Sequence, residues 1–228
     1  MDAKRFIPMV WIRGGQAAEP LAAGGWRSLG WPAEVAGRLE LEGADSILFR
    51  EAEPSGAASP WVQDVASALF IPFAVEAPFG SLGALGAVLE AGADQVLLDA
   101  QAPLLLEAAQ RFGRMRVAAA AALVRAGGDW RIGAEAGPEV LAWMEQMRWQ
   151  GAGAVYLDRV AGHPAADELL QGVARSLLSV VVHGSGAWPV PCYPWWCTPP
   201  ARRPKRPPCW STEPKAWPSR RKRLPRRR

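Results

Sequence analysis

The stretch that decides the fold is Glu42-Gly43-Ala44-Asp45-Ser46-Ile47-Leu48, because close copies of it recur twice. The copies are Ala91-Gly92-Ala93-Asp94-Gln95-Val96-Leu97 and Gln150-Gly151-Ala152-Gly153-Ala154-Val155-Tyr156. Each copy predicts a helix that ends at its glycine, where a left-handed C-cap favours glycine, followed by a buried strand. Successive copies begin 49 and 59 residues apart. One repeat therefore spans two strand–helix units, and repetition on this scale predicts a (β/α)8 barrel.

Short apolar runs alternate with amphipathic stretches on both sides of the repeats. The apolar runs are continuous, as is typical of strands covered on both faces of a parallel sheet. The predicted strands are Arg5–Ile12, Ser46–Phe49, Phe73–Val75, Gln95–Leu98, Arg116–Leu123, Ala154–Leu157 and Ser179–Val182. The predicted helices are Pro32–Leu41, Pro60–Leu69, Ser81–Glu90, Pro103–Phe112, Pro138–Trp149 and Pro164–Leu177. This order indicates an α/β fold of the TIM-barrel type.

The charges divide the chain into two parts. The 228 residues carry a formal net charge of +4, but residues 1–186 sum to −7 and residues 187–228 sum to +11. The second part also holds 11 of the 21 prolines and all three cysteines, and no strand or helix period survives there. We therefore expect an incomplete barrel domain over 1–186 that stops after its seventh strand. The Pro/Arg/Trp-rich basic tail, 187–228, is expected to be disordered or derived from a frameshift.

Composition excludes several classes of protein. Half of the residues are hydrophobic and 21% are charged, which excludes a wholly disordered chain. No run of 18 apolar residues occurs, so we expect no membrane span. Residues 1–186 contain no cysteine, which removes disulfides and thiol nucleophiles and favours a cytoplasmic protein. The glycine pairs Gly14-Gly15 and Gly24-Gly25 predict a flexible first loop rather than a phosphate-binding fingerprint.

Six short motifs within residues 1–186 carry a family resemblance. They are Ala3–Pro8, Trp31–Ala36, Phe70–Val75, Ala91–Val96, Leu105–Gly113 and Gly151–Gly153. In this order and spacing they resemble the cyclase subunit of imidazole glycerol phosphate synthase, a barrel enzyme of histidine biosynthesis. The resemblance implies a lyase-type ring closure of a bis-phosphorylated ribulosyl substrate, with ammonia from a glutaminase subunit in a heterodimer. It implies no cofactor.

The resemblance also locates the family's two catalytic acids, at the ends of strands one and five, where this chain has Trp11 and Ala122. An indole and a methyl group exchange no proton at neutral pH, so acid–base catalysis at these positions is lost. The glycine-rich phosphate loop after strand three becomes Glu76-Ala77-Pro78, in which Pro78 donates no N–H and Glu76 repels phosphate. We therefore expect a degenerate or inactive member, a pseudoenzyme that binds a phosphorylated metabolite or a partner subunit. The substrate- and phosphate-binding positions that the resemblance implies are Glu51, Asp99, Gly184 and Ser185.

The opposite end of the barrel is changed as well. By resemblance, a ring of charged residues gates ammonia where the strands begin. The matching positions are Arg5, Ser46, Gln95 and Ala154, and only Arg5 is charged. We expect the gate to be lost.

Two alternative functions remain open at this stage. Glu51, Glu76, Asp99 and Asp158 follow strand ends, as does His183, and together they could serve a metal-dependent enzyme or remain solvated acids. No metal ligand set is assigned. Trp11 could stack on a planar ligand or fill a vacated pocket.

The basic tail supports the second alternative. Arg202–Arg206 and Arg220–Arg223, interleaved with tryptophans, could bind nucleic acid through phosphates and stacked bases. Pro, Arg, Trp, Cys and Gly are also what GC-rich codons give out of frame, so this function depends on the tail being genuine coding sequence.

Overall fold

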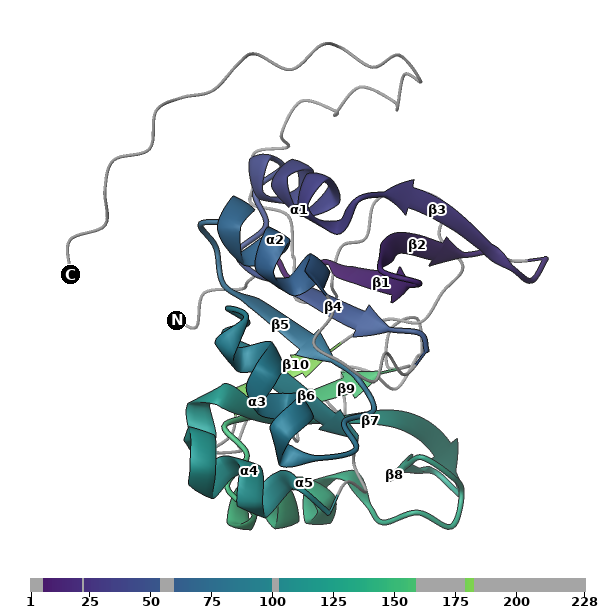
Figure 1. Cartoon of the computed structure of the whole chain (residues 1–228). Helices are drawn as coiled ribbons and strands as arrows, with labels where there is room; N and C mark the ends of the chain where they lie inside the picture. The colour runs from purple at the N-terminus through teal and green to yellow at the C-terminus, as the bar shows by residue number, and fades with distance from the viewer. Residues whose placement is uncertain (1–5, 22, 54–59, 100–102, 159–178, 183–228) are drawn as a thin grey trace, which may run out of the picture. The chain divides into compact units, whose positions relative to one another are not determined.

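The computed structural model describes residues 6–21, 23–53, 60–99, 103–158 and 179–182 (Figure 1). The chain divides into two units, Met1–Cys197 and Thr198–Arg228, and every described residue belongs to the first. The predicted helix Pro164–Leu177, the positions His183, Gly184 and Ser185, and the tail 187–228 lie outside the described residues.

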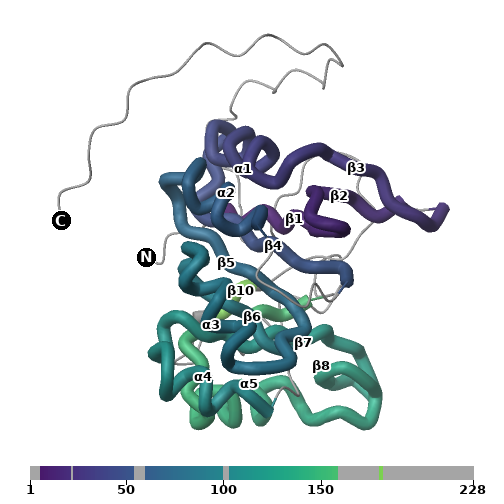
Figure 2. The backbone as a smooth tube through the Cα atoms, viewed as in Figure 1, coloured from purple at the N-terminus to yellow at the C-terminus, as the bar shows by residue number. Residues whose placement is uncertain are grey.

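Seven of the ten strands in the sheet of the described residues run parallel to one another. They are β1 (Met9–Arg13), β4 (Ile47–Glu51), β5 (Phe73–Glu76), β6 (Gln95–Asp99), β7 (Val117–Ala126), β9 (Ala154–Asp158) and β10 (Ser179–Val182). Each strand pairs with the next of this series in chain order. Figure 2 follows this path as a continuous tube. The predicted order of the parallel strands is therefore confirmed, and the fold is of the (β/α)8-barrel type.

Helices follow the strands and cover the outer face of the sheet (Figure 1). They are α1 (Pro32–Leu41), α2 (Pro60–Ala68), α3 (Leu82–Glu90), α4 (Leu105–Phe112) and α5 (Val140–Trp149), with a 3-10 turn η1 at Arg114–Arg116. One layer of the core lies between sheet and helices, where Ile47 and Phe49 of β4 pack against Trp61 of α2 and their neighbours. No helix within the described residues is long and apolar enough to cross a membrane.

The sheet curls so that its other face turns inward. Arg50 on β4 and Asp158 on β9 form an ion pair of 2.5 Å, although β5, β6 and β7 lie between these strands. In a flat sheet, strands about 4.8 Å apart would place β4 and β9 about 19 Å from each other, which no such side chains could bridge. The ion pair therefore requires the curvature of a barrel.

The inner face is lined by small side chains next to a few large ones. The buried inner cluster consists of Leu48, Ala74, Leu97, Ala118, Ala120, Ala154 and Tyr156, with Ile7, Met9 and Val181 packed against it. Barrel interiors usually hold bulky branched residues in layers. Here four alanines leave room that larger neighbours such as Tyr156 can occupy.

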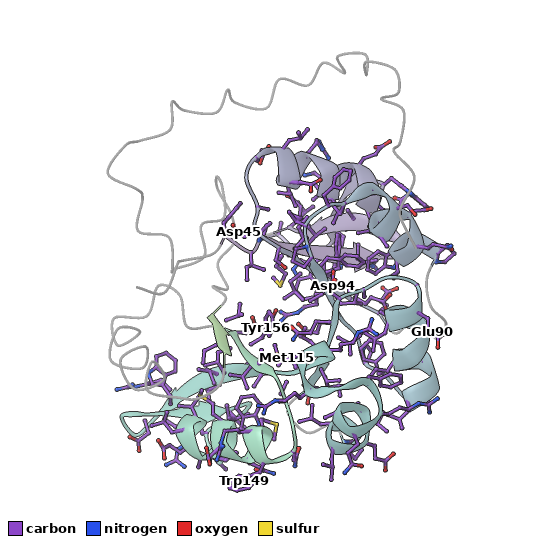
Figure 3. The ribbon with its side chains drawn as sticks, turned by 90° about the vertical axis from the view of Figure 1, so that its left-hand side faces the viewer. Asp45, Glu90, Asp94, Met115, Trp149 and Tyr156 are labelled. Carbon is purple, nitrogen blue, oxygen red and sulfur yellow. The ribbon has the colours of Figure 1, made fainter. Side chains whose placement is uncertain are left out.

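The repeated Gly-Ala-Asp segment ties each strand start to the preceding strand. Asp45 Oδ2 accepts a hydrogen bond from the Phe6 amide at 2.7 Å, and Asp94 Oδ2 accepts one from the Phe73 amide at 2.9 Å. The amides of both aspartates donate back to the carbonyls of the same partners. In the third copy Gly153 replaces aspartate, and its amide donates to the Val117 carbonyl at 2.9 Å. The repeat is thus a closing device for neighbouring strands, and Figure 3 shows Asp45 and Asp94 at the end where the strands begin.

The segment predicted to be a long first loop contains two strands instead. That segment is a β-hairpin of β2 (Gln16–Pro20) and β3 (Trp26–Gly30), and β2 pairs antiparallel with the last part of β1. A further short strand, β8 (Asp129–Ile132), folds back on β7. These segments have little strand pattern of their own, and the edge of β1 and the long β7 supply the backbone partners that make them strands. The first parallel strand begins at Met9 rather than at Arg5.

Candidate functional site

Polar side chains gather at the carboxyl ends of the parallel strands, which we call the mouth of the barrel. Side chains alternate along a strand, so the residue two places beyond each inner residue also faces inward. These residues are Trp11 on β1, Arg50 on β4, Glu76 on β5, Asp99 on β6, Ala122 on β7 and Asp158 on β9. We give the name mouth cluster to Trp11, Arg50, Glu76, Asp99 and Asp158.

Arg50 lies at the centre of the mouth cluster. Its Nη2 is 2.7 Å from Glu76 Oε2, and its Nη1 is 2.5 Å from Asp158 Oδ2. The side chains of Arg50, Glu76 and Asp158 are only 12%, 21% and 19% exposed. One guanidinium therefore joins two carboxylates from opposite sides of the barrel in a largely desolvated place.

Two indole rings continue the cluster from Arg50 to the hairpin. The Arg50 Cζ atom lies 5.2 Å from the centroid of the Trp11 ring. Trp11 meets Trp26 of β3 edge-on, with ring centroids 5.5 Å apart and planes at 69°. On the Trp26 ring, Arg13 places its Cζ atom 5.8 Å from the centroid. Each indole thus already accepts a cation from this chain, a contact that the negative face of the ring favours.

Burial and charge shift the pKa values of the central pair. Desolvation disfavours the charged form of Arg50, but the coulombic attraction of Glu76 and then of Asp158 outweighs it and raises the pKa of Arg50. Desolvation raises the pKa of Glu76 above its ordinary value, and Arg50 opposes this rise only in part. The negative charges of Asp158 and Asp99 add to it. Among the described residues of the mouth cluster, three carboxylates thus accompany the single guanidinium of Arg50.

This shift predicts a pH dependence of stability. Because the folded-state pKa of Glu76 is raised, its contribution to stability is fully present below the unfolded value near 4.5 and is lost as pH rises through the folded value. The substitution Glu76→Gln removes this loss, so the free energy of unfolding of the variant relative to the parent should increase with pH above about 4.5. Urea unfolding of both proteins between pH 4 and pH 8 measures the difference.

The substitution Glu145→Gln serves as a control, because its effect on the free energy of unfolding should change with pH in the opposite direction. The hydrogen bond from Arg148 lowers the pKa of the exposed Glu145 carboxyl, so its contribution is lost as pH falls. The raised pKa of Glu76 would be contradicted if the difference in free energy of unfolding between Glu76→Gln and the parent did not change with pH. A change in the same direction as that of Glu145→Gln would contradict it as well.

The structure brings together some of the predicted site residues and separates others. Glu76, Asp99 and Asp158 all face the mouth, but Glu51 lies two places beyond Phe49 and so shares the outer face of β4 with Ile47 and Phe49. Ala122 is the register partner of Asp158. Within the described residues no three His, Cys, Asp or Glu side chains group to hold a metal ion. The metal-dependent alternative gains no ligand set from them.

Sequence reasoning missed Arg50, which stands at the centre of the site. A signal was present, because a charged side chain inside the apolar run of a buried parallel strand is rare unless it is paired. Counting two places from the repeated Leu48 also puts Arg50, and not Glu51, on the inner face.

Uncharged side chains meet where the strands begin. The Tyr156 hydroxyl donates to Gln95 Oε1 at 3.2 Å, and Gln95 Nε2 donates to the Met115 carbonyl at 3.1 Å. Figure 3 shows Met115 and Tyr156 close together at this end. Of the four predicted gate positions, Arg5 lies outside the described residues. Gln95 occupies the third of these positions, and the two hydrogen bonds hold its side-chain amide in place.

Several curated proteins are similar to the chain. A protein of Myxococcus xanthus (strain DK1622) named imidazole glycerol phosphate synthase subunit HisF is 32% identical over 202 residues, covering 82% of this chain and 80% of the relative. The proteins of that name from Synechococcus sp. (strain CC9902) and Helicobacter hepaticus (strain ATCC 51449 / 3B1) are 31% and 30% identical. The matches cover 82% and 69% of this chain and 80% and 68% of those relatives. No protein-family model matches the chain.

Proposed function

The chain belongs to the HisF family of imidazole glycerol phosphate synthase subunits, and we propose that it is a member that has kept the barrel of histidine biosynthesis but lost the ring-closing reaction. The observation that carries the proposal is the chemistry of the mouth. Trp11 on β1 and Ala122 on β7, the positions to which the resemblance assigns the two catalytic acids, are inner-face positions on the side of the mouth. Neither side chain titrates, and each lost acid or base costs about 10²- to 10⁴-fold in rate.

Electrostatics of the mouth cluster point the same way. A bis-phosphorylated substrate needs cations or free amides, and the charged members of the cluster are one arginine and three acids. Arg50 is already paired with Glu76 and Asp158. A phosphate group of the substrate would also have to displace a carboxylate from Arg50. The free energy of that desolvated ion pair would then be lost.

The strand-start end supports the loss of the ammonia route. By resemblance, charged groups gate ammonia that a glutaminase subunit supplies, and this chain has Gln95 and Ala154 at two of those positions. The hydrogen bonds from Tyr156 to Gln95 and from Gln95 to Met115 fix an uncharged group there. We propose that the glutaminase partner of the family is not needed by this chain. Substrate binding at Glu51, Asp99, Gly184 and Ser185 stays a prediction, as does nucleic-acid binding by residues 187–228.

A cyclase assay with ammonia supplied directly tests the proposal, because it bypasses any partner. We expect turnover of the bis-phosphorylated substrate to be at least about 10⁴-fold below that of the Myxococcus xanthus relative, the loss expected for two missing proton-transfer groups. Thermal unfolding followed by circular dichroism on the same preparation checks that the protein is folded. Turnover within about tenfold of the relative would overturn the proposal.

A further inference from the structure

We propose that the end of the barrel where the strands begin binds a second copy of this chain, in a dimer with two-fold symmetry. We call this end the strand-start face. It consists of the helix ends and the segments that lead from them into the parallel strands, at residues 41–46, 69–72, 90–94, 111–116 and 149–153. The inference goes beyond the proposed function and does not depend on it, because the mouth lies at the other end of the barrel.

Exposed apolar side chains are the first ground for the proposal. Eight large hydrophobic side chains are exposed in the described part of the chain. The four most exposed all lie on the strand-start face, and they are Leu41 at 82%, Phe70 at 97%, Met115 at 72% and Trp149 at 75%. The other four are less than half exposed, and each lies outside this face. Apolar side chains gathered on one surface mark a contact with another molecule.

These four side chains form two groups. Glu40 Oε1, in the last turn of α1, accepts a hydrogen bond from the Phe70 amide at 3.0 Å, which brings Phe70 next to the helix end where Leu41 lies. Met115 precedes β7, and Trp149 precedes β9, the strand that pairs with β7. Figure 3 faces this end of the barrel and shows Met115 and Trp149 on it. Each half of the face thus presents two apolar side chains.

Charge is divided between the same two halves. On the half with Leu41 and Phe70, the segments before β4 and β6 carry the exposed acids Glu42, Asp45, Glu90 and Asp94. Beside Met115, the segment before β7 carries the exposed arginines Arg111, Arg114 and Arg116. Arg38, near the end of α1, points back toward the helix start and donates to the Leu29 carbonyl. We call the two parts the acidic half and the basic half.

A second copy is the occupant that this pattern favours. A two-fold axis through the face places the acidic half of one copy on the basic half of the other, and the reciprocal contact forms at the same time. The apolar side chains of each half are covered in the same step. A partner whose surface carried one sign of charge would meet like charge on one of the halves, which is unfavourable.

Sedimentation velocity of the full chain over a range of concentrations tests the proposal. We expect a reversible monomer–dimer equilibrium with a Kd of about 10 μM or tighter. Association should stop at two copies, because a two-fold contact uses the face of both. A chain that is still monomeric at about 200 μM overturns the inference, and so does open-ended association. A monomer that forms a complex only with an added glutaminase subunit overturns it as well.

Apolar substitutions locate the contact. Phe70→Ser and Leu41→Ser should each weaken the dimer by about tenfold or more, because each side chain is buried twice in a two-fold contact. Leu106→Ser removes a 46% exposed leucine near the start of α4, outside the strand-start face, and should change the Kd by less than about twofold. Melting curves confirm that each variant is folded. Equal Kd values for Phe70→Ser and Leu106→Ser overturn the inference.

Charge reversal tests the two-fold arrangement. Glu42→Arg and Arg114→Glu should each weaken self-association about tenfold, because like charges then face each other. An equimolar mixture of the two variants should associate within about threefold of the parent, because opposite charges face each other again in the mixed dimer. Residues 187–228 are the same in every variant, so their charge does not enter the comparison.

The control for the mixture is Glu107→Arg, which reverses an exposed charge in the first turn of α4, outside the strand-start face. Mixed with Arg114→Glu, it should associate no more tightly than Arg114→Glu alone. If the mixture of Glu42→Arg and Arg114→Glu associates no more tightly than this control, the inference is overturned.

Discussion

Replacing Arg50 with Met should lower the free energy of unfolding by about 3 kcal/mol. The substitution keeps an unbranched side chain of similar length but leaves Glu76 and Asp158 without their cation in a place where both are about four-fifths buried. Buried carboxylates that lose their partner keep the desolvation cost without the compensating attraction. The ion pair also joins β4 to β9 across the barrel, so the loss falls on contacts between strands far apart in the sheet.

Equilibrium unfolding in urea at pH 7 measures this loss, with two companion variants as controls. Arg148→Met removes an arginine whose pair with Glu145 lies on the surface of α5, and it should leave the midpoint within experimental error. The triple variant Arg50→Met, Glu76→Gln and Asp158→Asn removes all three charges, and most of the lost stability should return. If Arg50→Met cost no more than Arg148→Met, the central position of Arg50 in the site would be disproved.

Gly153→Ala should destabilise the protein by a similar amount, about 3 kcal/mol. A Cβ atom at this position would overlap the carbonyl oxygen of Arg114 and come within 3.1 Å of the Met115 Cα atom. All of these neighbours are backbone atoms, so no side chain can turn aside to relieve the contact. The hydrogen bond from the Gly153 amide to the Val117 carbonyl holds the two segments together at this point, and the alanine would force it apart.

Gly37→Ala is the matched control, and we expect it to raise the stability of the protein rather than lower it. Gly37 lies within α1, and a Cβ atom there would meet nothing within 4 Å. Alanine in a helix interior is favoured over glycine by about 0.5–1 kcal/mol, so the melting temperature should rise. Thermal and urea unfolding of both variants give the comparison. A Gly153→Ala protein as stable as its parent would show that the third copy of the repeat does not need glycine.

The third copy illustrates what can be read from sequence and what cannot. The repeat predicted correctly that residues 150–156 end a helix and begin a strand, since the glycine and the apolar run are local signals. It did not indicate why glycine replaces aspartate at position 153. The reason is the close passage of the Arg114 carbonyl, which comes from a turn 39 residues earlier.

The mouth shows the same division. Glu76 and Asp158 were recognised because they follow apolar runs, and their meeting at one end of the barrel follows from parallel strands. Arg50 and Glu51 are neighbours in sequence, and only the register of β4 decides that Arg50 enters the barrel and Glu51 does not. A shift of one residue would exchange them, because successive side chains of a strand point to opposite faces.

By itself, the sequence determined the order of the parallel strands and of the described helices between them, the repeat, and the absence of titratable side chains at Trp11 and Ala122. These features depend on residue type and on periodicity within a few residues. Only the tertiary structure decided that Arg50 joins Glu76 to Asp158, that Trp26 meets Trp11, and that the first loop is a hairpin. Each of these contacts joins residues that are separated along the chain, and their geometry depends on sheet register and curvature, which no local pattern specifies.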